Sequence, residues 1–405
     1  MHRRNREFLR LWVGQAVSQV GNSISGVALQ FVAVSTLNAT PAEMGLLAAA
    51  NGLSVLLFGL FAGAFADRVR RRPILIGVDL GRALVLATIP LGAMYGRLTM
   101  GHLYAVAAVI GALTVLFDSA YPAYIPSIVD EPDLLEANAK LALSQSVSEV
   151  AGPGVAGVLV RVAGAPVAVL LDAVSFVWSA MWLGAIRKRE PEPAARDADS
   201  HVFEEIREGL QTAWHHPILR ALALKNATGA FFLGFIGGLY FLFAVRELKL
   251  DPGVIGAIIS FGGVFSVAGS AGAQRLAGKF GLGRSMIVAA LGSGIGCLLI
   301  GLARGPVVVC AGFLCASQMF DIAWPVYGIG QTTLIQSVTP PEFMGRVNSA
   351  INLLFRGIVP LGSVVAGYLA EITGLRGAML AGGAGYLLSA FWLVRCKELR
   401  DWGRV

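Results

Sequence analysis

The sequence predicts an all-α polytopic membrane protein with twelve transmembrane helices in two pseudo-symmetric six-helix halves. Three observations lead to this fold class: an apolar composition, a series of long apolar stretches, and a repeat that relates the two halves. Of the 405 residues, 56% are hydrophobic and only 14% are charged, whereas soluble domains carry about 25% charged residues. The 50 glycines and 17 prolines fit this class, because small residues let membrane helices approach closely and kinks are tolerated there.

The apolar stretches are bounded by glycine, proline or charged residues, and each is at least about as long as the roughly 20 residues that a helix needs to cross a bilayer. They cover residues 9–36, 43–66, 74–95, 101–124, 140–162, 165–187, 221–246, 252–277, 285–303, 306–329, 347–372 and 375–396. The one long polar stretch, 188–220, predicts a cytoplasmic central loop with an amphipathic helix. It separates an N-terminal half, 1–187, from a C-terminal half, 221–405.

Positive charge is unevenly distributed between alternate connections. The chain has 32 lysine and arginine residues and a formal net charge of +7. The termini and one set of loops hold 24 of these residues, the opposite loops hold six, and two lie inside spans. Because cytoplasmic loops retain positive charge, this bias predicts that both termini are cytoplasmic. A nucleic-acid-binding surface would not produce the alternation, so we expect no nucleic-acid partner.

Cysteine and histidine residues do not form a pattern that is typical of metal sites or enzyme active sites. The four cysteines form no CxxC or Cys/His pattern, and the five histidines fall in predicted loops or termini. These patterns predict neither a metal site nor a catalytic cluster. A GxxxxGK(S/T) phosphate loop is absent from the sequence, which argues against an ATP-driven pump. We therefore expect no enzymatic activity and no cofactor.

An internal repeat relates the two halves. At an offset of 210 residues, the matches include Gly152 with Gly362, Gly157 with Gly367 and Gly164 with Gly374. At an offset of 203 residues, FDSAYP at 117–122 matches FDIAWP at 320–325. Parallel repeats of this kind are used by transporters in which two halves alternate around a central substrate.

Several motifs carry a resemblance to a known family. Residues 63–72, GAFADRVRRR, resemble the loop between the second and third helices that is the signature of the major facilitator superfamily. Residues 150–157, VAGPGVAG, resemble the Gly-Pro motif of its exporters, which implies a hinge at Gly152, Pro153 and Gly157. Shorter matches, including LWVGQ at 11–15, are similar to the drug-exporter branch that contains macrolide-efflux and enterobactin-export proteins.

The signature loop predicts a conformational latch. Asp67 and Arg68, with Arg72, can form charge-assisted hydrogen bonds to a neighbouring helix terminus. The alternative is that these arginines only set orientation and contact anionic lipid. Asp79 and Arg82 are three residues apart on one helix face and can pair with each other, and we assign them to the same latch.

A few ionisable residues within the spans are candidates for proton coupling, since a charge inside the bilayer needs a partner or a proton. Asp118 and Asp321 each precede a proline by four residues, which predicts symmetric kinks where polar groups gather. Glu149 is our choice of protonatable coupling residue because it lies beside the Gly-Pro motif and burial favours the protonated carboxyl. Asp172 lies near the start of its span, where a negative charge interacts favourably with the helix dipole. Arg356 is expected to be the counter-charge of Glu149 or to bind an anionic group of the substrate.

Polar and aromatic side chains predict a substrate pathway. Gln15, Gln19 and Asn22, with two serines, form a polar stripe along one face of the first span. The stripe either lines the pathway or makes interhelical hydrogen bonds. Tyr121 and Trp324, next to the repeated acids, and Arg356 complete the predicted contacts.

The sequence therefore predicts a monomeric secondary transporter of the cytoplasmic membrane. The resemblance implies export of an amphipathic small molecule, such as a drug, macrolide or siderophore-like compound, in exchange for protons. The expected partners are this substrate, protons and the lipid bilayer. The alternatives are an uptake carrier of the same superfamily and a receptor or scaffold that does not transport.

Overall fold

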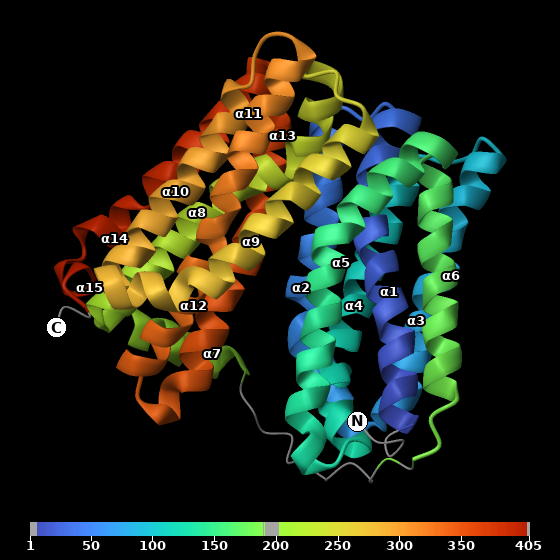
Figure 1. Cartoon of the computed structure of the whole chain (residues 1–405), viewed down its shortest axis with the longest axis horizontal. Coiled ribbons are helices and arrows are strands. Elements are labelled where there is room, and N and C mark those ends of the chain that lie inside the picture. The colour runs from blue at the N-terminus through green and yellow to red at the C-terminus, as the bar shows by residue number, and fades with distance from the viewer. Residues whose placement is uncertain (1–5, 189, 191–201, 403–405) are drawn as a thin grey trace. The chain divides into compact units, whose positions relative to one another are not determined.

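The computed structural model of the chain describes residues 6–188, 190 and 202–402 (Figure 1). Over these residues every regular element is a helix, and eleven helical segments are long and apolar enough to cross a membrane. One of them, residues 344–395, is interrupted at Gly374, whose φ of 80° and ψ of 160° are not helical. Because Gly374 divides this segment into two helices, the described residues agree with the predicted all-α fold of about twelve spans.

The first part of the chain forms six long helices. They are α1 (Arg6–Phe31), extended by the π-helical η1 (Val32–Thr36), α2 (Pro41–Arg68), α3 (Arg71–Met94), α4 (Met100–Ile128), the short η2 (Glu131–Asp133), α5 (Leu134–Ala163) and α6 (Ala165–Gly184). Gly164 separates α5 from α6 with a φ of 88°, a left-handed conformation that glycine adopts without a side-chain clash. Thr99 begins α4 by accepting a hydrogen bond from the backbone nitrogen of His102.

The second part begins with the predicted amphipathic helix. The elements are α7 (Val202–His215), α8 (Pro217–Leu242), η3 (Phe243–Glu247), α9 (Pro252–Phe280), α10 (Leu282–Leu302), α11 (Val307–Met319), η4 (Phe320–Ile322), α12 (Ala323–Val338), η5 (Pro341–Phe343), α13 (Met344–Ser389), α14 (Phe391–Arg395) and α15 (Lys397–Arg400). Helix α7 packs on the start of α13, where Glu208 and Arg346 form an ion pair of 2.5 Å.

The helices around the two repeated prolines differ. Helix α4 continues through Pro122 as far as Ile128, whereas the corresponding span changes at Asp321 into one 3-10 turn before α12 begins. Pro325 therefore lies in the first turn of α12, where the missing N–H has no helical partner to lose. The two copies therefore differ in local helix type, and the symmetric kinks stay a prediction.

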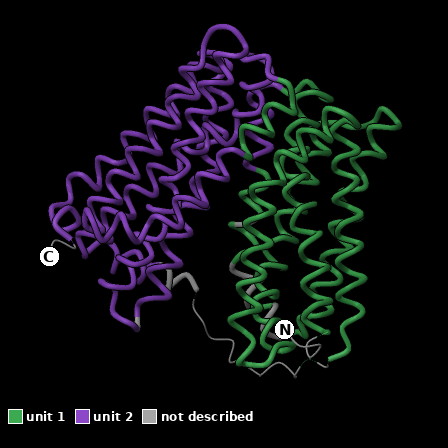
Figure 2. The backbone as a smooth tube through the Cα atoms, viewed as in Figure 1, with its two compact units in different colours: residues 1–39, 50–198, 251–260 green, residues 40–49, 199–250, 261–405 purple. Residues whose placement is uncertain are grey.

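The helices group into two compact units (Figure 2). Unit 1 contains residues 1–39, 50–198 and 251–260, and unit 2 contains residues 40–49, 199–250 and 261–405. Each unit has its own apolar core: the core of unit 1 includes Phe8, Leu75 and Tyr124, and that of unit 2 includes Met286 and Leu334. The halves 1–187 and 221–405 remain a prediction from the sequence repeat.

Candidate functional site

Unit 1 encloses a cluster of charged side chains. Asp79 and Arg82 lie on α3, and Asp172 lies on α6, which packs against both α1 and α3. Both carboxylates are 0% exposed and Arg82 is 5% exposed. Burial of a charge is costly unless it is paired and hydrogen-bonded, so the partners of these groups determine what the cluster can do.

Serines of α6 hold one oxygen of each carboxylate. Ser179 Oγ donates to Asp79 Oδ2 at 2.6 Å, and Ser175 Oγ donates to Asp172 Oδ1 at 2.9 Å. Ser179 also accepts a hydrogen bond of 2.7 Å from Gln15 Nε2 of α1. The remaining oxygens, Asp79 Oδ1 and Asp172 Oδ2, have no hydrogen-bond partner among the described residues. One oxygen of each acid therefore lacks a hydrogen bond.

Arg82 is the cation of this cluster. Its guanidinium lies 3.6 Å from Asp79 Oδ1, which is the intrahelical pair that the sequence predicts. The guanidinium carbon is 4.8 Å from the centre of the Phe117 ring and 5.1 Å from that of Phe176, distances at which cation–π attraction contributes. Arg82 also interacts electrostatically with Asp172. These contacts hold the cation beside Asp79 and within electrostatic reach of Asp172.

Helix α1 approaches the cluster closely through Gly21. A Cβ atom at Gly21 would collide with Ser175 Oγ and Asp172 Oδ1, whereas a Cβ at Gly26 on the same helix would meet no atom within 4 Å. We predict that Gly21→Ala lowers the melting temperature in detergent and impairs transport, with a stability cost of about 1–3 kcal/mol. Gly26→Ala is the matched control and should match the unsubstituted protein. Equal effects of the two substitutions would contradict the close α1–α6 contact.

Unit 2 contains a different buried charge that the sequence analysis missed. Lys225 lies near the start of the predicted span 221–246 and is 3% exposed on α8. Its Nζ lies 3.7 Å from the centre of the Tyr327 ring and donates to the hydroxyl of Tyr386 at 3.5 Å. The neighbouring Asn226 accepts from Tyr327 at 3.0 Å and donates to Gln331 at 2.9 Å. Aromatic rings and neutral polar groups, rather than a carboxylate, surround this ammonium group among the described residues.

The signature loop contacts the end of a neighbouring helix through Arg72. Its Nε donates to the carbonyl of Leu183 at 3.0 Å and its Nη2 to that of Gly184 at 2.6 Å, at the carboxyl end of α6. Glu190 accepts from the backbone nitrogens of Arg71 and Arg72 at 2.9 and 3.1 Å, which caps the start of α3. The contact predicted for this loop is present at Arg72, and its role as a latch stays a prediction.

The side chains of two other predicted latch residues, Asp67 and Arg68, lie outside the described residues.

The predicted proton-coupling residues are less enclosed than expected. Glu149 is exposed on α5 and accepts a hydrogen bond of 2.9 Å from Gln145, so the burial on which its selection depended is not observed. Asp118 is also exposed, and Asp321 is half-buried in η4. The exposed positions of Glu149 and Asp118 do not supply the burial that would favour a protonated carboxyl.

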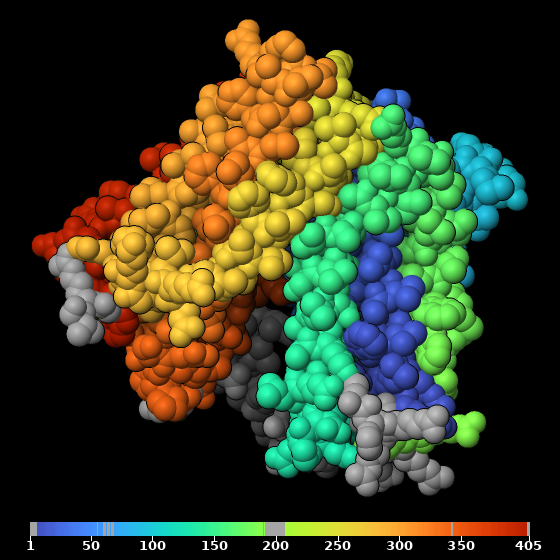
Figure 3. All heavy atoms as spheres, in the orientation of Figure 1, coloured from blue at the N-terminus to red at the C-terminus, as the bar shows by residue number. Residues whose placement is uncertain are grey.

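The polar stripe on α1 divides between two environments. Gln15 is 4% exposed and bonded to Ser179, which is the interhelical contact given as the alternative to its predicted pathway role. Gln19 is half-buried, and Asn22 is exposed. On the face drawn in Figure 3, the atoms of α1 lie between those of α5 and α6. A pathway role for Gln19 and Asn22 stays a prediction.

The other predicted pathway residues do not form one cluster. Tyr121 stacks on Phe117 in unit 1, with 5.4 Å between ring centres. Trp324 packs against Tyr386 in unit 2, with ring centres 5.5 Å apart. Arg356 is exposed on α13 and makes no ion pair or hydrogen bond with a described residue. Trp324 is thus linked to the environment of Lys225 through Tyr386.

The Gly-Pro motif is a site of close packing in unit 1. Helix α5 continues through Pro153 without a break. A Cβ at Gly152 would collide with Ser23 of α1, and one at Gly157 would collide with backbone atoms in the first turns of α9. These contacts account for the glycines, and the hinge predicted at Gly152, Pro153 and Gly157 stays a prediction.

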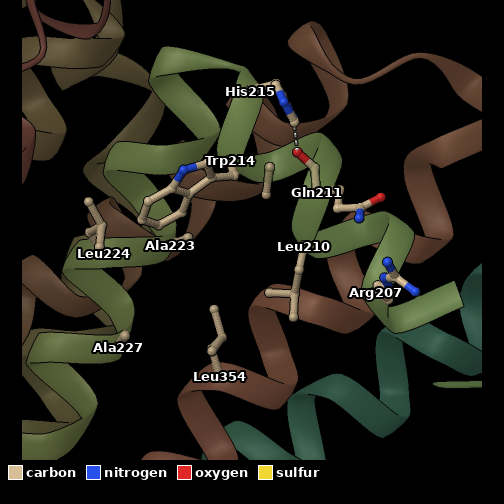
Figure 4. Close-up of a pocket in the computed structure, with 10 residues that line it drawn as sticks. Arg207, Leu210, Gln211, Trp214, His215, Ala223, Leu224, Ala227 and Leu354 are labelled. Carbon is tan, nitrogen blue, oxygen red and sulfur yellow. Dashed lines mark hydrogen bonds between the residues drawn. The ribbon is translucent and has the colours of Figure 1, made fainter. Parts of the chain in front are cut away.

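A cavity of about 560 Å³ lies beside α7 in unit 2 (Figure 4). Its wall is mainly apolar and includes Leu210, Trp214, Ala227 and Leu354. His215 is held at its edge by a hydrogen bond of 2.7 Å to the carbonyl of Gln211. Helix α8 therefore contributes both to this apolar cavity and, through Lys225, to the polar core of the unit.

The bundle of apolar helices with enclosed charges defines a multi-pass membrane transporter. The chain belongs to the Major Facilitator Superfamily, whose family model matches residues 11–363.

Relatives extend along nearly the whole chain. Macrolide efflux protein A of Streptococcus pyogenes is 24% identical over 97% of this chain and 96% of its own length. Multidrug efflux pump Tap of Mycolicibacterium fortuitum is 27% identical over 94% of this chain and 93% of its own length.

Solved structures share the fold. A bacterial homologue of the iron transporter ferroportin in an inward-facing state has a TM-score of 0.77 at 18% identity, with 96% of this chain and 98% of that chain covered. The nucleoside transporter NupG has a TM-score of 0.78 at 11% identity, with coverage of 96% and 98%. These likenesses establish the architecture.

Proposed function

We propose that this transporter exports an amphipathic small molecule across the cytoplasmic membrane in exchange for protons. The observation that carries the proposal is the nearly end-to-end similarity to two proteins named for macrolide and multidrug efflux. Both termini are placed in the cytoplasm by the distribution of positive charge. The halves 1–187 and 221–405 alternate around the substrate, as in other transporters built from repeats.

Enclosed carboxylates support the proton as the driving ion. An intramembrane acid is expensive to keep charged and is a common element of proton relays. Asp79 and Asp172 are both fully enclosed in unit 1. A gradient of protons supplies the energy that an exporter without a nucleotide-binding loop needs.

Flux in proteoliposomes tests this function. Purified protein is reconstituted, a pH gradient is imposed, and uptake is measured for a panel of macrolides, lipophilic cations and siderophore-like compounds. We predict that at least one compound accumulates when the lumen is acidic, because protons leave as substrate enters, and that an ionophore that dissipates the gradient abolishes the accumulation.

The same assay separates the alternatives. Accumulation that requires an alkaline lumen would indicate an uptake carrier coupled in the opposite sense. Folded protein that produces no gradient-dependent flux with any compound would favour a receptor or scaffold. Protein-free liposomes and liposomes with heat-denatured protein control for passive partition of amphipathic compounds into the bilayer.

A further inference from the structure

We propose that Asp79 and Asp172, together with Arg82, form the proton-binding site of this transporter and hold one exchangeable proton. The inference rests on the proposed proton antiport and names the residues that carry it. It places the proton inside unit 1, on α3 and α6, rather than at Glu149 on the exposed side of α5.

The charge of the cluster gives the number of protons. Two carboxylates share one guanidinium in a site where both acids are 0% exposed. With the three enclosed groups ionised, and the exposed Asp118 left out of the count, the cluster carries one uncompensated negative charge, and a buried charge without a partner is strongly unfavourable. Binding of one proton makes the cluster neutral, whereas a second proton would leave Arg82 uncompensated.

The hydrogen bonds show where the proton is held. Ser179 and Ser175 each donate to one oxygen of their acid, which leaves Asp79 Oδ1 and Asp172 Oδ2 without hydrogen bonds among the described residues. A protonated carboxyl has one O–H donor, so these two oxygens are the positions available to the proton. Arg82 lies on the Asp79 side at 3.6 Å, which favours Asp79 as the ionised member and Asp172 as the protonated member.

The helices around the cluster add few other titratable groups. Helix α4 contributes Asp118, which interacts electrostatically with Arg82, and Tyr121, which interacts with Asp79. The buried face of α1 contributes neutral Gln15, and Ser25 lies near the Asp172 carboxyl. Among the described residues packed here, Arg82 is the cation whose electrostatic interactions change when either enclosed acid binds a proton.

A direct contact links the protonation state to α1. Ser179 donates to Asp79 and accepts from Gln15 of α1, while Gly21 places the backbone of α1 against Asp172 and Ser175. A change of charge on either acid alters the groups that hold α1 on α6. Because α1 also carries Gln19 and Asn22 on its less enclosed side, this helix connects the proton site to the predicted substrate pathway.

Replacement of either acid by its amide tests the site. Asp79→Asn and Asp172→Asn each leave Arg82 with one carboxylate, so both variants should fold. We predict that each reduces transport driven by a pH gradient at least about tenfold and keeps gradient-independent substrate exchange within about twofold. Potentiometric titration of the purified protein should show one proton fewer bound by each variant, a result that does not depend on transport.

Controls separate this site from other carboxylates and from the proposed function. Glu149→Gln removes an exposed acid and should leave gradient-driven flux intact. Ser179→Ala should shift the pH profile of transport, while Ser119→Ala, whose hydroxyl bonds only a carbonyl of its own helix, should not. If an amide variant fails to fold, the two serine variants test the site instead: equal pH profiles for Ser179→Ala and Ser119→Ala would contradict it.

The assignment is overturned if the unsubstituted protein shows gradient-driven flux that Asp79→Asn and Asp172→Asn leave unchanged, or if Glu149→Gln alone abolishes it. An unchanged proton count in both amide variants also overturns it. If the unsubstituted protein shows no gradient-driven flux, proton antiport fails, and the titration then reports separately whether the cluster binds a proton.

Discussion

Replacement of Arg82 by glutamine is expected to destabilise the protein by about 3–5 kcal/mol, the cost of removing one partner from a buried charge pair. The substitution leaves Asp79 and Asp172 together in a site that is closed to solvent. It also removes the guanidinium from its position against Phe117 and Phe176. The loss is measured as a fall in melting temperature and in the fraction of monodisperse protein after extraction in detergent.

A second substitution shows whether charge balance causes this loss. Asp79→Asn combined with Arg82→Gln leaves a single acid, which becomes neutral with one proton, and should recover part of the stability in a double-mutant cycle. Arg82→Lys should be intermediate, because the charge remains while the planar contact with two rings is lost. Arg82→Gln should also be more stable at low pH, where both acids gain protons. A stability that is equal in all these variants would contradict the role of Arg82 as the compensating charge.

The fold could be predicted from the sequence because a segment that crosses the bilayer must form a helix of about 20 apolar residues. Apolar stretches of about 20 residues have few structural alternatives in lipid. The same reasoning does not distinguish Pro122 from Pro325, although the shared motif lies in a continuous helix in one copy and at a 3-10 turn in the other. Pro122 lies inside α4, whereas Pro325 lies in the first turn of α12. The sequence repeat does not specify where each helix begins relative to its proline.

The enclosed site was harder to predict because burial is a property of helix rotation. The spacing of Asp79 and Arg82 predicts the pair that the structure shows. For Asp172 the sequence predicts only an interaction with the helix dipole, whereas Ser175 of the same helix donates a hydrogen bond to it. Lys225 lies near the start of the predicted span 221–246, where a lysine side chain commonly extends to the membrane surface, so its burial could not be predicted from its position. Glu149 was chosen for its neighbouring motif, which carries no information about the side of α5 that it occupies.

Replacement of Gly234 by valine is expected to destabilise unit 2 by about 3 kcal/mol, at the upper end of ordinary overpacking. A Cβ at this position would collide with the backbone of α13 at Val359 and Ser363. The same crossing is held by a hydrogen bond of 3.0 Å from Ser363 Oγ to the carbonyl of Gly234. Membrane helices associate through such close approaches because lipid gives them little hydrophobic drive to pack. Melting temperature in detergent is the measurement.

Gly237 of the same helix provides the matched control. A Cβ there would meet no atom within 4 Å, so Gly237→Val carries the same change in helix propensity without the collision with α13. Its melting temperature should stay within a few degrees of the unsubstituted protein, since surface substitutions usually change stability by no more than about 0.5 kcal/mol. If the two valine variants melt at the same temperature, any loss they share comes from replacing a glycine in a helix, and the α8–α13 backbone contact does not stabilise unit 2.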